Sequence, residues 1–280
     1  MTKNQWKSKS TEILQGKWKT AFLCFAIVCL VQMLGAWIST GANTLLPMPK
    51  QESLATVNQN YVFSLWVSLA GRWAISLPVN LCRSLLFTGI FGMFYAWANG
   101  EPAAIRDMFR YFRCKPFIQT FFAVGIVTII NTSGQFVQGF LRAAGFSPAL
   151  RGLLALLLFA ITVVLDIGMF LFQYLLIRNP EMTFRERREA LTALVRPNIW
   201  QFIGFELQFL GWWIVLGLLG ILLMMLFFQV GVPFVFFKNT VIPFYCGAGF
   251  YFWPYYHMSK VLFAGHLYRE VYCSKKKKKK

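Results

Sequence analysis

Apolar residues are gathered into six long runs, and polar residues are concentrated in the loops between them. A helix rises about 1.5 Å per residue, so about 20 apolar residues cross a hydrocarbon core of about 30 Å. Each run reaches or approaches this length and therefore predicts a membrane-spanning helix. The predicted spans are Thr20–Thr40, Val79–Ala98, Phe117–Gln138, Leu153–Ile177, Trp200–Phe228 and Val241–Ala264.

Basic residues are distributed unequally between alternate loops, which predicts the orientation of the chain. Twenty-two of the 28 Lys and Arg residues fall in the N-terminal segment, in the loops after the second and fourth spans, and in the C-terminal part. The opposite loops hold only Lys50, Arg142, Arg151 and Lys238. Because cytoplasmic loops carry an excess of Lys and Arg, we expect both termini in the cytoplasm.

One apolar region is ambiguous, because Tyr61–Ala98 is too long for a single crossing. Gly71, Arg72 and Pro78 interrupt it. Two crossings here would move the next basic loop outside, which the charge distribution disfavours. We therefore interpret Tyr61–Leu77 as an outer-surface or re-entrant helix, without excluding that it spans the membrane.

The two basic cytoplasmic loops each predict an amphipathic surface helix. One is expected to begin at Asn179-Pro180-Glu181 and to end at Arg196-Pro197. In the earlier loop Ile105, Phe109 and Phe112 have helical spacing, and an arginine directly follows each of them in the sequence. Arginines on such helices reach the lipid headgroups. The residues predicted to bind anionic lipid are Arg106, Arg110, Arg113, Arg185 and Arg188.

The composition supports a single all-α membrane domain. Hydrophobic residues make up 57% of the chain and charged residues 14%, more apolar surface than a water-soluble chain of 280 residues can bury. We expect one membrane-embedded helical domain over residues 1–272. The remaining residues, 273–280, contain Lys275–Lys280 and predict a disordered tail that attracts anionic lipid or simply fixes the orientation. The net charge of +18 therefore favours lipid as a partner, not nucleic acid.

Several short motifs carry a resemblance to a known family. They are Gly16-Lys17-Trp18, Asn179-Pro180-Glu181, Phe209-Leu210-Gly211-Trp212, Pro254-Tyr255 and Tyr268. On these residues the chain resembles a bacterial family of uncharacterised integral-membrane proteins, domain of unknown function 975, best over Arg178–Tyr272. Gln229–Phe252 departs from the family pattern by being enlarged and aromatic. The resemblance implies a polytopic plasma-membrane protein and brings no substrate.

Four polar residues within the predicted spans are candidates for function. At 1.5 Å per residue, Asp166, Arg83 and Asn131 lie about 16, 22 and 21 Å from the inner ends of their spans, and Glu206 about 9 Å. Ionisable residues at such depths mark functional sites by default. The alternative is a structural lock, in which Asp166 is neutral or paired with Arg83.

Signals of an enzyme are missing from the sequence. It contains no His-Glu-x-x-His, no Gly-x-Ser-x-Gly and no phosphate-binding Gly-x-x-x-x-Gly-Lys-Ser/Thr. Its two histidines, His257 and His266, have no neighbouring metal ligand and are interpreted as core or interface residues. We therefore expect no catalytic residue, metal or cofactor.

Two functional hypotheses remain. The first is a non-enzymatic membrane module that binds lipid or another membrane protein. The second is a small transporter or channel-like component built around Asp166. A polar, water-accessible centre would favour transport, and a tightly packed bundle with a broad exposed apolar surface would favour binding.

Overall fold

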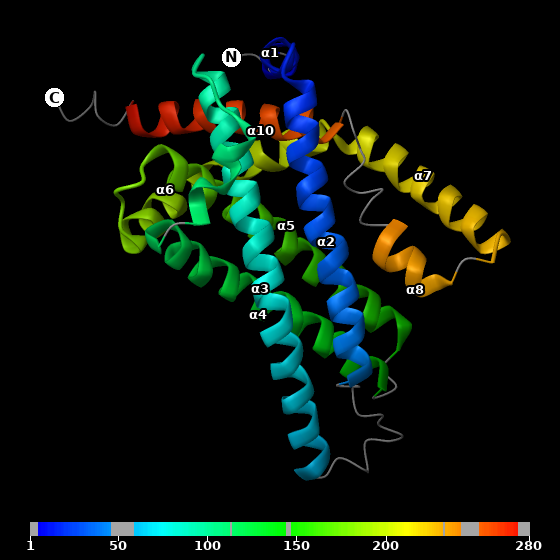
Figure 1. The fold of residues 1–280 in the computed structure, drawn as a ribbon. Coiled ribbons are helices and arrows are strands. Elements are labelled where there is room, and N and C mark those ends of the chain that lie inside the picture. Colours follow the sequence, from blue (N-terminus) through cyan, green and yellow to red (C-terminus); the bar gives the residue numbers. More distant parts are fainter. Residues whose placement is uncertain are drawn as a thin grey trace.

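Helices form every regular element in the part of the chain that the structure describes. The computed structural model describes residues 5–45, 59–112, 114–143, 147–231, 233–241 and 252–273. These ranges contain no β-strand, and Figure 1 shows long helices joined by short connections. The predicted all-α polytopic bundle is confirmed.

Four of the described helices are long and apolar enough to cross a membrane. They are α2 (Trp18–Leu45), α3 (Gln59–Ala98), α5 (Pro148–Arg178) and α7 (Leu210–Gln229). A fifth span results if α4 (Cys114–Ala143) is combined with the preceding 3₁₀ helix η2 (Ile105–Phe112), at a bend of 81°. In Figure 1 α2 and α3 run side by side, and they are in contact along the bundle.

The helix α3 is continuous over 40 residues, so the interpretation of Tyr61–Leu77 as a separate helix is wrong. Pro78 lies inside α3 and removes one backbone hydrogen bond. The helix nevertheless continues, and Val79, the next residue, packs directly on Gly35 of α2, where a β-carbon would leave no room. Forty residues span about 60 Å, about twice the hydrocarbon thickness.

The first predicted surface helix is the 3₁₀ helix η2, and this changes which residues face the bundle. With three residues per turn, Ile105, Met108 and Tyr111 share the inward face, and Met108 is fully buried. Phe109 and Phe112 are exposed. The predicted apolar face with α-helical spacing is therefore wrong, because the turn is tighter than an α-helix.

The second predicted surface helix is α6 (Phe184–Leu207), whose ends differ from the prediction. Thr183 caps it through a capping box with Glu186, whereas Asn179 is the C-cap of α5. The helix also passes through Pro197 to Leu207. A turn at Gln208–Phe209 separates the two helices, so the predicted span Trp200–Phe228 is divided between α6 and α7.

The helix α10 (Phe252–Tyr268) crosses the bundle near the end where α1 lies (Figure 1). None of its residues is exposed, which is typical of a core helix, and it contacts α1 (Gln5–Leu14), α2, α3, α5 and α6. It forms the second half of the predicted span Val241–Ala264, of which residues 242–251 lie outside the described residues. The π-helix η4 (Arg269–Cys273) follows, and Lys275–Lys280 also lie outside the described residues.

The helix α7 stands apart from the bundle. None of its apolar 18-residue window is buried, and Figure 1 shows it extending away from α10. Gly231, at φ +78°, then turns the chain into α8 (Phe234–Phe236) and the π-helix η3 (Phe237–Val241). This segment returns to α2, where the Asn239 side-chain amide donates a hydrogen bond to Thr40 Oγ1 at 2.8 Å.

Candidate functional site

The candidate site is built on the middle of α10, where four polar residues lie within one helical turn. Tyr256, His257, Ser259 and Lys260 are all buried there. Tyr256 and Lys260 are four residues apart and therefore share one face of the helix. Burial of so many polar groups is costly unless each finds a partner.

Lys260 finds its partner in Glu206, near the end of α6. Its Nζ lies 2.9 Å from Glu206 Oε1, with 9% of the lysine side chain and 23% of the glutamate side chain exposed. The Tyr256 hydroxyl donates to the other carboxylate oxygen of Glu206 at 2.5 Å and accepts from Lys260 Nζ at 3.2 Å. The three residues form a closed triangle that joins α6 to α10.

Asp166 of α5 and Arg83 of α3 extend this triangle into an ionic cluster. Asp166 interacts electrostatically with Lys260, Arg83 and Glu206. Among the residues that the structure describes, no ion pair joins Arg83 to Asp166, and the close ion pair of the cluster is that of Lys260 with Glu206. The structure thus brings together three of the four predicted polar residues. The side chain of Asn131 lies outside the described residues, although its backbone belongs to α4.

Both Asp166 and Arg83 face the interior of the bundle and yet are exposed. Asp166 lies on α5 between Val163 and Phe170, at helical spacing, and both neighbours pack in the main apolar core. Arg83 precedes Leu86 and Phe87 by three and four residues, and these also pack in that core. Two opposite charges therefore remain accessible on inward faces of adjacent helices.

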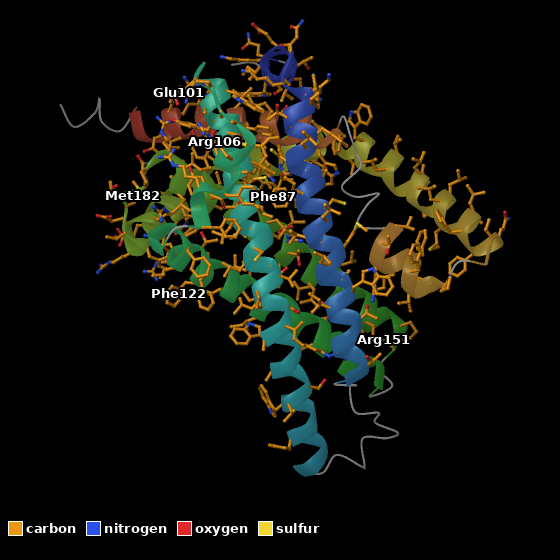
Figure 2. The ribbon with its side chains drawn as sticks, viewed as in Figure 1. Phe87, Glu101, Arg106, Phe122, Arg151 and Met182 are labelled. Carbon is orange, nitrogen blue, oxygen red and sulfur yellow. The ribbon has the colours of Figure 1, made fainter. Side chains whose placement is uncertain are left out.

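His257 lies beside the cluster in a box of aromatic rings. The rings of Phe25, Phe87, Phe91 and Trp253 lie 5.3–5.5 Å from the imidazole, centroid to centroid, and Figure 2 shows Phe87 in the C-terminal half of α3. Neither imidazole nitrogen has a hydrogen-bond partner among the described residues. The histidine thus packs as an apolar core residue, as its isolation in the sequence predicts.

The N-terminal helix α1 packs against α10 next to the cluster. Trp6, Ser10 and Leu14 follow each other at four-residue spacing and are buried. The hydroxyls of Ser10 and Ser259 lie 2.8 Å apart, one residue from Lys260. The helix therefore makes a direct polar contact with α10 one residue from Lys260.

Sequence reasoning missed Lys260 as a site residue, because it was counted among the cytoplasmic basic residues. The signal that could have found it is its position within a predicted span, four residues after Tyr256 in an aromatic run. A lysine there must pair with a carboxylate or lie in water, and the predicted spans contain only two acids, Asp166 and Glu206.

The predicted lipid-binding arginines lie on η2 and α6. Arg106 and Arg110 are exposed beside Phe109 on η2, and Figure 2 places Arg106 near the end of α3 that lies toward α1. Arg185 is also exposed, at 3.1 Å from Glu189 of the next turn. Arg113 lies outside the described residues.

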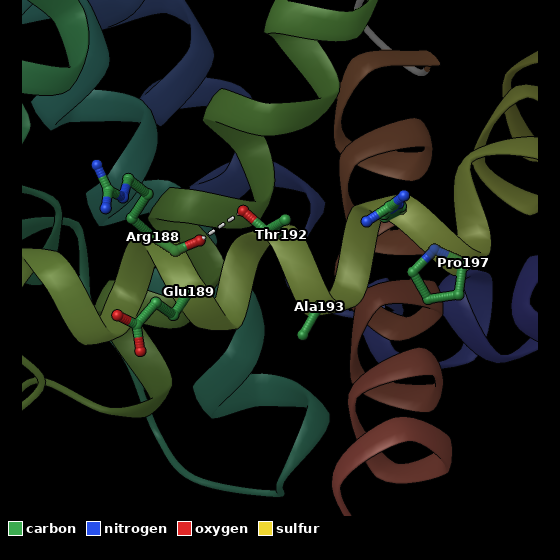
Figure 3. A pocket seen from close by; sticks show the side chains of 6 residues that line it. Arg188, Glu189, Thr192, Ala193 and Pro197 are labelled. Atoms are coloured by element: carbon green, nitrogen blue, oxygen red, sulfur yellow. Dashed lines mark hydrogen bonds between the residues drawn. The ribbon is translucent and has the colours of Figure 1, made fainter.

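A shallow, open hollow occupies the outer face of α6. Its lining includes Arg188 and Arg196, which flank Thr192 at four-residue spacing, and Figure 3 shows the Thr192 hydroxyl bonded to the Arg188 carbonyl. All six lining residues come from one helix, so this feature is a helix surface and not an enclosed pocket.

Arg187 behaves differently from its neighbours, because its side chain is fully buried. It donates hydrogen bonds to the carbonyls of Asn179 and Met182 at 3.1 and 3.2 Å. Burial lowers the pKa of its guanidinium to about 10, so it stays charged near neutral pH. The C-terminal end of α5, where carbonyls are unpaired, favours this positive charge. Arg187 therefore fixes the corner between α5 and α6.

Comparisons with known proteins add no identification. No protein-family model, curated protein or solved structure matches the chain. Within the described ranges, no group of three or more His, Cys, Asp and Glu side chains could hold a metal ion. The ionic cluster therefore has to be interpreted from its own geometry.

Proposed function

We propose that this chain is a small, non-enzymatic membrane transport component whose polar pathway passes the ionic cluster. The observation that carries the proposal is the accessibility of Arg83 and Asp166 on inward faces of α3 and α5. A charged side chain among acyl chains costs about 2.5–3.5 kcal/mol on insertion scales, so these two groups are expected to face water or a solute. Ionisable residues in this position mark ion and substrate pathways.

Water access to the site can be tested on one helix. We expect Asp166→Cys, in a background without native cysteines, to react with a membrane-impermeant, positively charged thiol reagent. Val164→Cys is the matched control, because Val164 is also exposed, lies only about 3 Å away along α5 and points to the opposite side. Its thiol should stay in lipid and react at least tenfold more slowly. Equal rates at the two positions, or no reaction at 166, would argue against a hydrated pathway.

The transport step itself requires a flux measurement. Purified protein in liposomes should release or take up small charged solutes faster than empty liposomes do. Asp166→Asn should abolish this flux while preserving expression and detergent elution volume. Unchanged flux in that variant would remove Asp166 from the pathway.

The binding hypothesis stays a second candidate because of α7. Most of its apolar side chains are exposed and none of its apolar window is buried, as expected of a helix that contacts lipid or a partner helix. Co-purification of a stoichiometric lipid or membrane protein that is lost on deletion of α7 would favour binding over transport.

The orientation of the chain and its location in the plasma membrane belong to the same proposal. The charge distribution supports cytoplasmic termini, and the motifs given above support membership of the uncharacterised family. We expect Arg110→Cys and Arg188→Cys to be protected from an impermeant reagent in whole cells, and Lys238→Cys to react. All three side chains are exposed, whereas the buried Arg187 is unsuited to the test. Labelling of the first two from outside would reverse the topology.

A further inference from the structure

Two charges of the ionic cluster lack a direct partner within the described structure. Lys260 and Glu206 neutralise each other at 2.9 Å, and Tyr256 completes their hydrogen bonds. Arg83 and Asp166 make no hydrogen bond or ion pair with another residue whose side chain is described. What remains is one accessible cation and one accessible anion.

These two charges lie on helices that are fixed against each other. On α3, Ser84 follows Arg83 directly, and its hydroxyl accepts a hydrogen bond from Gln173 Nε2 of α5 at 2.8 Å. The same Nε2 donates to the Ser84 carbonyl at 3.0 Å. Gln173 lies seven residues after Asp166, two turns along the same face of α5. These hydrogen bonds join α3 to α5 next to Arg83 and two turns from Asp166, so the two helices are held together independently of the two charges.

Resting on the proposed transport function, we propose that the site takes a small zwitterion. Its carboxylate or phosphodiester lies on Arg83, and its ammonium group lies on Asp166. The planar guanidinium offers paired donors that match a carboxylate or phosphate, and the aspartate accepts from an ammonium group.

The charge balance of the cluster favours this class of ligand over a singly charged one. Arg83 and Lys260 carry two positive charges, and Asp166 and Glu206 carry two negative ones. A zwitterion satisfies both free groups and leaves the sum at zero. An ion of one sign would satisfy one group and leave the other without a charged partner.

The same chemistry occurs in two sources, namely a free zwitterion such as an amino acid and the headgroup of phosphatidylethanolamine. The test uses the full chain in nanodiscs of phosphatidylglycerol. Four soluble probes are compared by calorimetry: glycerophosphoethanolamine and glycine as zwitterions, glycerophosphoglycerol as an anion, and ethanolamine as a cation. We expect both zwitterions to bind at least tenfold more tightly than either single-charge probe.

Variants then assign the two ends of the ligand. Arg83→Gln should weaken zwitterion binding at least tenfold and leave ethanolamine unaffected. Asp166→Asn should weaken it equally and leave glycerophosphoglycerol unaffected. Arg72→Gln, a neutralised arginine three turns away on the same helix, is the matched control and should change nothing. If a neutral variant fails to fold, Arg83→Lys and Asp166→Glu keep the charges and should weaken zwitterions severalfold while preserving the preference for them.

The outcomes separate the sources and the two proposals. Nanodiscs of phosphatidylethanolamine that block glycerophosphoethanolamine would identify a lipid headgroup, and unchanged binding would identify a free solute. Single-charge probes that bind as tightly as zwitterions, or variants without effect, would overturn the inference. Zwitterion binding without flux in liposomes would refute the transport function and leave the zwitterion site standing. Selective flux of a singly charged ion would refute the zwitterion ligand and leave the transport function standing.

Discussion

Replacing Glu206 by glutamine is expected to lower the free energy of unfolding by about 3 kcal/mol. The change leaves the Lys260 ammonium group buried without its carboxylate, and breaking a buried ion pair in this way typically costs about 3–5 kcal/mol. The lower end applies because Asp166 lies within electrostatic reach of Lys260 and can compensate in part. Equilibrium unfolding in mixed detergent micelles measures the loss.

A double variant tests whether Glu206 and Lys260 stabilise the protein as a pair. Glu206→Gln combined with Lys260→Met removes both charges, so we expect it to recover at least half of the loss. The exposed pair Arg185 and Glu189 is the matched control, and Glu189→Gln should cost less than about 0.5 kcal/mol. Strictly additive losses in the double variant would mean that the two residues contribute independently.

An alanine at Gly89 is expected to destabilise the protein by about 3 kcal/mol through a steric clash. An added β-carbon would overlap the backbone of Met108 in η2, so α3 and η2 could not keep their present distance. Overpacking typically costs about 1–3 kcal/mol, and the upper end applies because a backbone cannot rotate away as a side chain can. The loss should appear as a lower melting temperature and as faster protease cleavage at η2.

Gly125 on α4 provides the control with the opposite sign. A β-carbon there would meet no atom within 4 Å. Alanine is favoured over glycine inside a helix by about 0.5–1 kcal/mol, so Gly125→Ala should be neutral or slightly stabilising. If Gly89→Ala behaved like Gly125→Ala, the close contact between α3 and η2 would not exist in the membrane.

The apolar pattern predicts the spans well where one run corresponds to one helix. Thr20–Thr40 lies within α2, and Leu153–Ile177 lies within α5. The pattern fails where a proline predicts the end of a helix. Pro78 and Pro197 both lie inside helices, because tertiary packing outweighs the loss of one hydrogen bond.

The site was predicted in part, from depth alone. Depth placed Arg83 and Asp166 at similar levels, and the structure has them in electrostatic reach. Depth does not specify which helix faces are adjacent, so the ion pair of Glu206 with Lys260 was not found. The burial of α10 depends on contacts with five other elements, which no local pattern in its sequence encodes.

The length of α3 sets how the molecule responds to bilayer thickness. The apolar part of α3, Trp66–Ala98, has 33 residues and spans about 50 Å, and a tilt of 40° still leaves about 38 Å along the bilayer normal. Its N-terminal end, with exposed Phe63 and Trp66, therefore reaches the headgroup layer, where aromatic residues are favoured. The 20 residues of α7 match about 30 Å and have no such reserve. In a thicker membrane α3 can tilt less and still span the hydrocarbon core, whereas α7 would be too short to span it.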